Sequence, residues 1–125
     1  MQKREKTNMK NYSITHTSNE GRRELHDELG LSGAEISLNN LPAGTNVPFV
    51  HTHKNNEEIY FIISGKGHVI IDGETIELTA GDFIKISPEG KRQFFAGNNS
   101  PISYLCIQVK KNSLEGYTAT DAIMA

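Results

Sequence analysis

The stretch that decides the fold, residues 51–67, reads HTHKNNEEIYFIISGKG and carries two histidines, two glutamates and two glycines around an apolar run. Its middle, EEIYFIIS, is rich in β-branched and aromatic residues, which is typical of a strand. Side chains on a strand alternate between faces, so His51 and His53 would point the same way, with Cα atoms about 6.5–7 Å apart. The pair therefore predicts a place where two imidazoles converge on one ion.

Two glutamates, Glu57 and Glu58, follow the histidines after the segment KNN at residues 54–56. A turn at KNN would fold the chain so that the next strand brings a carboxylate across from the histidines. Alternation alone does not choose between the two glutamates, because both faces of the following strand are apolar. Two histidines and one carboxylate form a set that holds Fe(II), Mn, Ni or Zn with open positions. H-x-H by itself also occurs by chance on exposed strands.

The remainder of the chain repeats the strand pattern. Short runs rich in β-branched and aromatic residues alternate with turn formers from residue 33 onward; these runs are AEISLNNL, NVPFVHTH, EEIYFIIS, GHVIID, ETIEL, DFIKIS, RQFFAG and ISYLCIQVK. The segment DGE at Asp72 is the clearest hairpin turn, and GKG at residues 65–67 also reads as a turn. This spacing predicts an all-β sandwich or barrel. Upstream, residues 18–30 have capping residues, leucines four apart and a glycine stop, which predicts a short N-terminal helix.

Composition narrows the class of protein. The chain has 125 residues, with 13 Lys and Arg against 15 Asp and Glu. It therefore lacks the excess of positive charge that is typical of nucleic-acid-binding proteins. No apolar run is long enough for a membrane span, the charged start is not followed by the apolar stretch of a secretory signal, and Cys106 is the single cysteine. We expect a polar N-terminal segment, 1–18, one domain over 19–125, a cytoplasmic location, and neither nucleic acid nor membrane as a partner.

Two motifs resemble those of the cupin superfamily. The first comprises Gly44, His51 and His53, Glu58 and Gly65; the second is GDFIKISPEGKRQ at residues 81–93, and the resemblance covers roughly residues 37–109. It implies a double-stranded β-helix, a jelly-roll barrel with a divalent transition metal ion (Zn, Mn, Fe or Ni) inside one end. The family pattern leaves six residues between the ligand glutamate and the glycine, which selects Glu58 beside the two histidines.

The chain departs from this pattern at Gln93, where the second motif of the family has a histidine as fourth metal ligand. An amide oxygen can coordinate an ion, but it is neutral and a poorer donor to borderline metals than imidazole. Gln93 is therefore either a weak ligand or the holder of a metal-bound water, or a polar barrel residue without a metal role. The other three ligands suffice for a catalytic ion.

A substrate pocket would lie beside the ion. The side chains expected in its wall are Phe49, Tyr60, Ile62, His68 and Phe95. Core packing alone would demand the same apolar residue types, and His68 fits a strand residue that faces solvent or a hydrogen-bond partner better than a residue of the pocket. Tyr60 is the wall residue with a polar group that could touch a substrate. Cys106 reads as a small buried hydrophobe without a nucleophilic role.

The sequence indicates the function less directly than the fold, because proteins of one fold can have many different activities. The resemblance implies a divalent-metal-binding cupin that acts on or binds a small polar molecule, such as a sugar or an organic acid, at the metal. A non-catalytic small-molecule or metal-binding module and a metal-free scaffold are the alternatives. A homodimer is also implied, with residues 11–18 and 116–125 available to cover exposed sheet edges.

Overall fold

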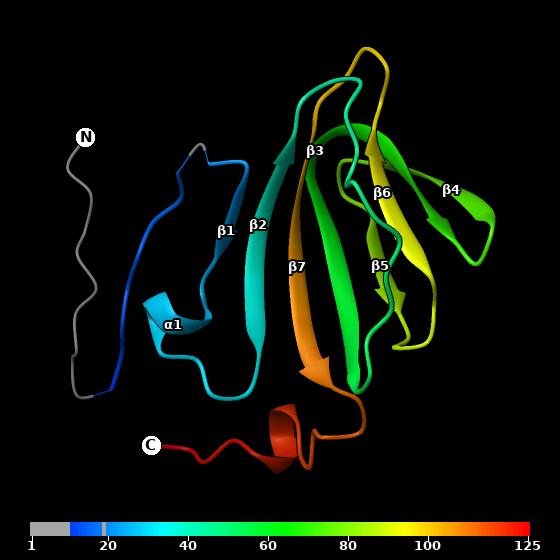
Figure 1. The fold of residues 1–125 in the computed structure, drawn as a ribbon. Helices are drawn as coiled ribbons and strands as arrows, with labels where there is room; N and C mark the ends of the chain where they lie inside the picture. Colours follow the sequence, from blue (N-terminus) through cyan, green and yellow to red (C-terminus); the bar gives the residue numbers. More distant parts are fainter. Residues whose placement is uncertain (1–10, 19) are drawn as a thin grey trace.

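The computed structural model describes residues 11–18 and 20–125, so most of the predicted N-terminal segment, residues 1–10, lies outside the described residues, as does residue 19. The described elements are β1 (Arg22–Glu24), α1 (His26–Leu29), β2 (Glu35–Leu41), β3 (Asn56–Ile71), β4 (Glu74–Thr79), β5 (Phe83–Ile86), β6 (Arg92–Ala96), β7 (Ile102–Lys110) and the 3₁₀ turn η1 (Thr118–Thr120). The structure is therefore nearly all β, as the sequence predicts (Figure 1).

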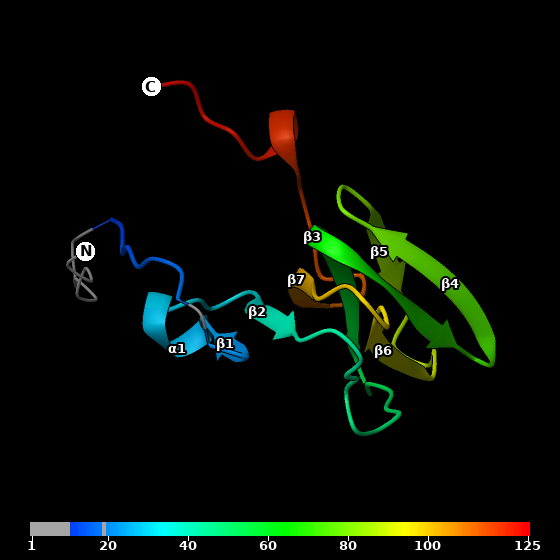
Figure 2. The same ribbon diagram turned by 90° about the horizontal axis from the view of Figure 1, so that it is seen from above.

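The long strand β3 connects two sheets. Its first part, residues 56–65, pairs with β7 and, over residues 58–61, with β5. Farther along the strand, residues 66–71 pair with β4 and residues 67–71 with β6. The sheet that contains the first part continues through β7 to β2 and β1. Figure 2 shows the result from above, with β1 and α1 beyond β2 on one side and β4, β5 and β6 on the other. The strand pairings in the described part of the chain are all antiparallel, and the arrangement is a jelly roll.

The segment GKG lies inside β3, so the prediction of a turn between two strands is wrong. Gly65 has φ +82°, and a Cβ atom there would lie 1.8 Å from the carbonyl oxygen of Pro101. A Cβ atom at Gly67 would lie 2.1 Å from the carbonyl oxygen of Phe95. Glycine is needed because the neighbouring backbone approaches closely where β3 passes from one sheet to the other. The predicted turn at DGE is confirmed, with positive φ at both Asp72 and Gly73 between β3 and β4.

The N-terminal helix is shorter than residues 18–30 predict. Arg22–Glu24 forms strand β1 against β2, and α1 covers only His26–Leu29 before Gly30 ends it in the left-handed conformation. Arg23, buried in β1, makes two hydrogen bonds to the carboxylate of Glu28 in α1. The polar contacts of Arg23 explain why this segment forms a strand and one helical turn in place of a longer helix.

The core lies between the two sheets. Alternate side chains of β3, β6 and β7 point inward, as shown by the buried–half-buried alternation along β6. The buried apolar side chains are Tyr60, Ile62, Val69, Leu78, Ile86, Phe94, Ala96, Ile102, Tyr104 and Cys106. At one end of this core the inward positions become polar, with Ser37, Asn39, Glu58 and Arg92 all buried. None of the helices in the described part of the chain has the length and apolar character to cross a membrane.

Candidate metal centre

The two histidines lie on the connection between β2 and β3, which is irregular and not the strand that NVPFVHTH predicts. His51 forms an isolated bridge, in which its backbone N–H donates to Arg92 O and its carbonyl accepts from Arg92 N, each at 3.1 Å. The backbone N–H of His53 donates to the carbonyl of Pro88 at 2.8 Å. The connection is therefore fixed against β6 and the turn before it, and this places both imidazoles without a continuous strand.

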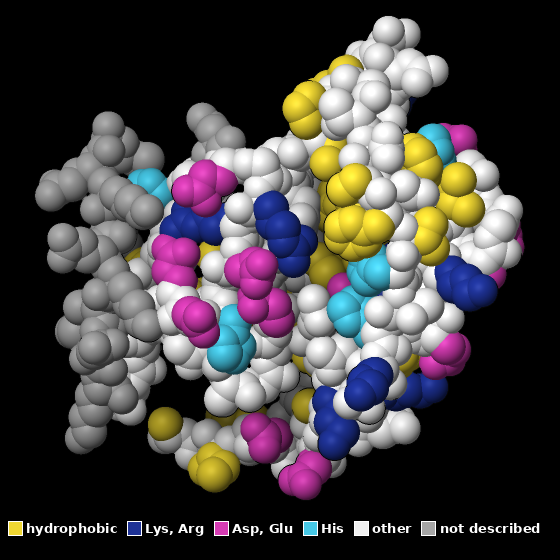
Figure 3. Space-filling model, viewed as in Figure 1, with side chains coloured by type: hydrophobic (Ala, Val, Ile, Leu, Met, Phe, Trp, Pro, Cys, Tyr) yellow, Lys and Arg dark blue, Asp and Glu magenta, His cyan; other side chains and the backbone are white. Residues whose placement is uncertain are grey.

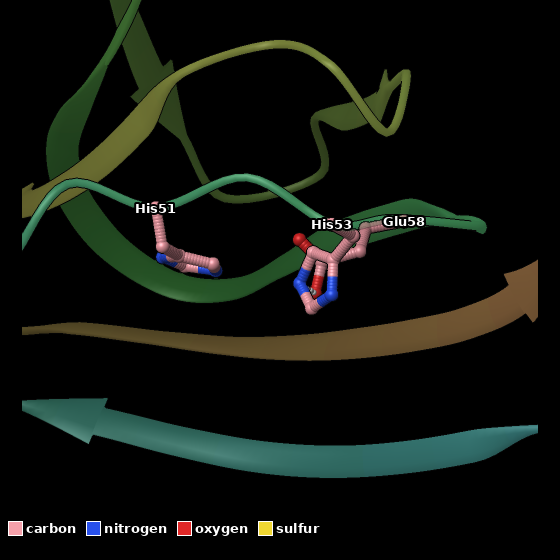
Figure 4. Close-up of side chains that lie close together, drawn as sticks. All are labelled: His51, His53 and Glu58. Atoms are coloured by element: carbon pink, nitrogen blue, oxygen red, sulfur yellow. Dashed lines mark ion pairs between the residues drawn. The ribbon is translucent and has the colours of Figure 1, made fainter.

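His51, His53 and Glu58 come together as the sequence predicts. The ring centroids of the two histidines are 5.1 Å apart, and the ligand atoms of all three residues lie within 4.8 Å of one another. A bend at Lys54 and Asn55 precedes β3, so Glu58 follows on the next strand. The three side chains leave the connection and β3 on the same side, toward β7 (Figure 4). The neighbouring Glu57 lies in a separate groove with Ile59 and Lys85.

Two ring nitrogens at this site are buried without a hydrogen-bond partner, Nδ1 of His51 and Nε2 of His53. Nε2 of His53 lies 3.2 Å from Oε2 of Glu58, yet the pair lacks hydrogen-bond geometry. An unpaired buried polar atom costs about 1–3 kcal/mol. A cation between these atoms would satisfy both rings and the carboxylate oxygen, so the donor set fits a metal ion of the transition series.

Glu58 is buried and held in its ionised form. Burial alone would raise its pKa, but hydrogen bonds from Tyr60 and Arg92 and the charge of His53 outweigh burial and lower the pKa below the usual value. Arg92 Nη1 donates to Oε1 at 2.5 Å and the Tyr60 hydroxyl donates to the same oxygen at 2.6 Å. Oε2 faces His53 and accepts a weak hydrogen bond from the Cys106 thiol at 3.4 Å. One carboxylate oxygen is thus anchored by protein donors, and the other faces the histidines.

The pKa of His51 is lowered, which favours its neutral form. Burial lowers the pKa of His51, and the positive charges of His53 and Arg92 act in the same direction, against the opposing effect of Glu58. A neutral imidazole has a lone pair available for an ion. Glu58 therefore contributes the negative charge of this donor set, and the rings contribute nitrogen.

Gln93 lies in the wall of the same cavity, on β6. Its amide nitrogen donates to the carbonyl of Val47 at 2.8 Å. That bond leaves the amide oxygen as the atom that could accept a cation or a metal-bound water. The two alternatives for Gln93, metal ligand or polar wall residue, therefore both stay open.

The site opens into a cavity of about 440 Å³. Of the predicted wall residues, Tyr60 and Phe49 line it, and Phe49 is 57% exposed at its edge. In Figure 3 two neighbouring histidine side chains lie at a hollow beside hydrophobic side chains. The opening allows a small molecule to approach the three candidate ligands.

The other three predicted wall residues lie elsewhere, and these assignments are corrected. Ile62 is fully buried in the apolar core. The ring of His68 stacks on Phe95, with centroids 4.6 Å apart and 10° between planes, and His68 lines a different groove with Lys66 and Glu77. Alternation along β3 places His68 on the opposite face from Val69, which points into the core.

Several residues in or next to the cavity wall carried no signal in the sequence. Arg92 is 0% exposed and also donates to the carbonyls of Gly90 and Ser87, at 2.9 and 2.6 Å. Only its place beside Gln93 in the second motif could have suggested a role. Arg92 lies behind the wall, paired with Glu58. The wall residues that the sequence did not indicate include Gly21, Arg22, Asn39, Asn40, Asn46, Tyr104 and Gln108. Cys106, predicted to be buried, also lines the cavity, and burial followed by the charge of Glu58 raises its pKa to about 12.

Comparison with known proteins agrees with this geometry. The cupin domain family matches residues 37–108, more than half of the chain, and the chain therefore belongs to the cupin family. A crystal structure of a cupin protein from Bacteroides fragilis is 61% identical, with a TM-score of 0.90 over 94% of this chain and 99% of that one.

Two further likenesses are more distant. An uncharacterised protein of Methanocaldococcus jannaschii is 35% identical over 66 residues, 53% of this chain, and the match spans about half (52%) of that relative's length. A putative sugar phosphate isomerase from Acidithiobacillus ferrooxidans is 22% identical, with a TM-score of 0.64 over 71% of this chain and 58% of that one. At this level of identity, the similarity to the Acidithiobacillus ferrooxidans protein concerns the fold alone.

Proposed function

We propose that this cupin binds one divalent transition metal ion, Zn, Mn, Fe or Ni, through His51, His53 and Glu58. The observation that carries the proposal is the pair of buried, unpaired ring nitrogens beside an ionised carboxylate. Three protein ligands leave coordination positions open, which is typical of ions that meet a substrate or ligand. The adjoining cavity would admit a small polar molecule, such as a sugar or an organic acid.

The chemistry that such an ion supplies is the polarisation of a carbonyl, carboxylate or hydroxyl group. The protein side chains prepare the site for it. Arg92 and Tyr60 fix one oxygen of Glu58, and the backbone contacts of His51 and His53 fix the ring positions. Phe49 lies at the exposed edge of the cavity, where its ring can contact the apolar part of a ligand.

A non-catalytic binding module is the second candidate, and the titratable groups of the cavity wall favour it. Burial raises the pKa of Tyr60, and its hydroxyl already donates to Glu58. Burial also raises the pKa of Cys106 to about 12. Neither group is suited to proton transfer near neutral pH, because an efficient acid or base has a pKa near the working pH.

Metal content tests the proposal. The 125-residue chain, purified without chelator and analysed by inductively coupled plasma mass spectrometry, should contain close to one transition metal ion per chain. The double variant His51→Ala, His53→Ala should contain none, whereas the matched control His68→Ala should keep the ion, because His68 lies in another groove. Wild-type protein that takes up no metal under saturating supply would refute the proposed site.

A further inference from the structure

Strand β1 carries two adjacent arginines, Arg22 and Arg23, whose side chains point to opposite faces of the strand. Arg23 is buried, and its guanidinium donates to Glu28, to the hydroxyl of Thr15 and to the carbonyl of His16. Arg22 lines the cavity that contains the candidate metal ligands. Successive side chains of a strand point to opposite sides. The hydrogen bonds that hold Arg23 on one side of β1 therefore direct Arg22 to the other side, toward the cavity. Both residues lie before residues 37–108, which match the family.

The guanidinium of Arg22 is positioned but retains free donors. Nη1 donates to Oδ1 of Asn39 at 2.8 Å, and Asn39 is itself buried and donates to the hydroxyl of Ser37 at 3.0 Å. Nε lies 3.5 Å from the carboxylate of Glu24, in a pair whose side chains are 54% and 61% exposed. An exposed pair of this kind contributes about 0–1 kcal/mol. Since a guanidinium has five N–H donors, Arg22 can bind a further acceptor.

Arg22 has no ion pair with any described residue that lines the cavity. Glu58 is paired with Arg92, and Glu24 is not among the residues that line the cavity. Arg22 lines the same cavity as His51 and Tyr104. A guanidinium with free N–H donors at the wall of a cavity attracts an anion.

The amide groups of the wall are largely committed to protein partners. Asn40 donates to the carbonyl of Glu20 and accepts from Ser103, while Asn46 and Gln93 both donate to the carbonyl of Val47. Each of these bonds takes one of the two N–H groups of an amide that could otherwise bind the hydroxyl groups of a neutral sugar. The guanidinium of Arg22 is therefore the strongest donor that the described wall offers to a ligand.

We propose that Arg22 binds the anionic group of a small organic anion, whose compact apolar body contacts Phe49 and Tyr104 while its other end reaches the metal site. This inference rests on the proposed function, since it places the ligand in the cavity beside His51 and His53. It narrows that ligand from any small polar molecule to an acid. A guanidinium pairs with carboxylates and phosphates by the same two-pronged geometry, so the anionic charge is the shared requirement.

Binding of three aromatic probes tests the proposal. Benzoate, phenyl phosphate and the neutral benzamide are titrated calorimetrically into the full chain, once free of metal and once loaded with Zn²⁺. At least one anion should bind about tenfold more tightly than benzamide in both forms, as expected for a charge-assisted hydrogen bond. The anion that shows this preference distinguishes a carboxylate from a phosphate ligand.

The variant Arg22→Gln should bring the affinity of that anion down to the level of benzamide and leave the zinc stoichiometry unchanged. Lys85→Gln, which removes the same charge from an exposed position on β5, should leave the preference intact. Equal binding of benzamide and both anions by the wild type, or equal losses in the two variants, would overturn the role of Arg22. Because the metal-free form is tested too, failure of zinc binding alone would refute the metal site and not the anion site.

Discussion

Two arginine–glutamate pairs of this protein have similar chemistry and different surroundings. Arg23 and Glu28 join β1 to α1, with side chains 6% and 25% exposed, and Arg92 and Glu58 join β6 to β3, with side chains 0% and 3% exposed. Arg23 is surrounded by the hydroxyl of Thr15 and the carbonyl of His16 as well as Glu28. The Glu58 carboxylate, in contrast, has one oxygen facing a histidine nitrogen that lacks a hydrogen bond.

The difference shows how an ion pair can serve either structure or binding. Arg92 holds Oε1 of Glu58 and so fixes Oε2 toward His53, where negative charge is needed for a cation. Arg23 holds a chain segment in place, and this segment carries Arg22 at the cavity wall. A buried pair is weak evidence of stabilisation by itself, whereas removal of one partner is costly. Variants of each arginine therefore separate the two roles.

The largest effect is expected from Arg92→Met. It would leave Glu58 buried without its cation and release the carbonyls of Ser87 and Gly90, so the free energy of unfolding should fall by about 3–5 kcal/mol. Urea unfolding followed by circular dichroism measures this change. The double variant Arg92→Met, Glu58→Gln should recover part of the loss, because no uncompensated charge remains. A loss below about 1 kcal/mol in the single variant would contradict the role of this pair.

A smaller loss is expected from Arg23→Met, because Glu28 is partly exposed and water can replace part of the interaction. The free energy of unfolding should fall by about 1–3 kcal/mol, measured in the same urea experiment. The affinity for Zn²⁺, measured by competition with a chromophoric chelator, should stay within about twofold of wild type, well under 1.4 kcal/mol. A tenfold loss of zinc affinity would show that the two pairs do not have separate roles.

The smallest effect is expected from Gln93→His, which adds an imidazole to the cavity wall beside the Glu58 pair. If the side chain at position 93 reaches the ion, zinc affinity should rise about tenfold, or about 1.4 kcal/mol. Gln93→Leu, which keeps the size and removes the oxygen, is the matched control and should bind zinc no more tightly than wild type. Unchanged affinity in Gln93→His would assign Gln93 to the cavity wall alone.

Much of the fold could be predicted because strand signals are local. The runs that became β2, β4, β5, β6 and β7 were found within a few residues, and Asp72 and Gly73 form the expected hairpin turn. GKG was misread because a glycine required by a close backbone contact looks the same in sequence as one required by a turn. Residues 18–30 were misread because the pairing of Arg22–Glu24 with β2 and the contacts of Arg23 are tertiary.

The candidate site was predictable where its residues form a motif. His51, His53 and Glu58 come together as expected, although the histidines lie on an irregular connection. Arg22 and Arg92 were missed because a sequence does not show which charged side chains become buried or face a cavity. His68 was misplaced because alternation decides its face only once the register of β3 is known. The homodimer expected from the family resemblance stays a prediction.

The most direct test of the metal centre is anomalous X-ray diffraction from crystals of the full chain grown with Mn²⁺. We predict a single strong anomalous peak bonded to ring nitrogens of His51 and His53 and to Oε2 of Glu58, with Arg92 still paired to Oε1. A map at saturating Mn²⁺ with no peak at these three side chains, or with the ion bound elsewhere, would contradict the proposed centre.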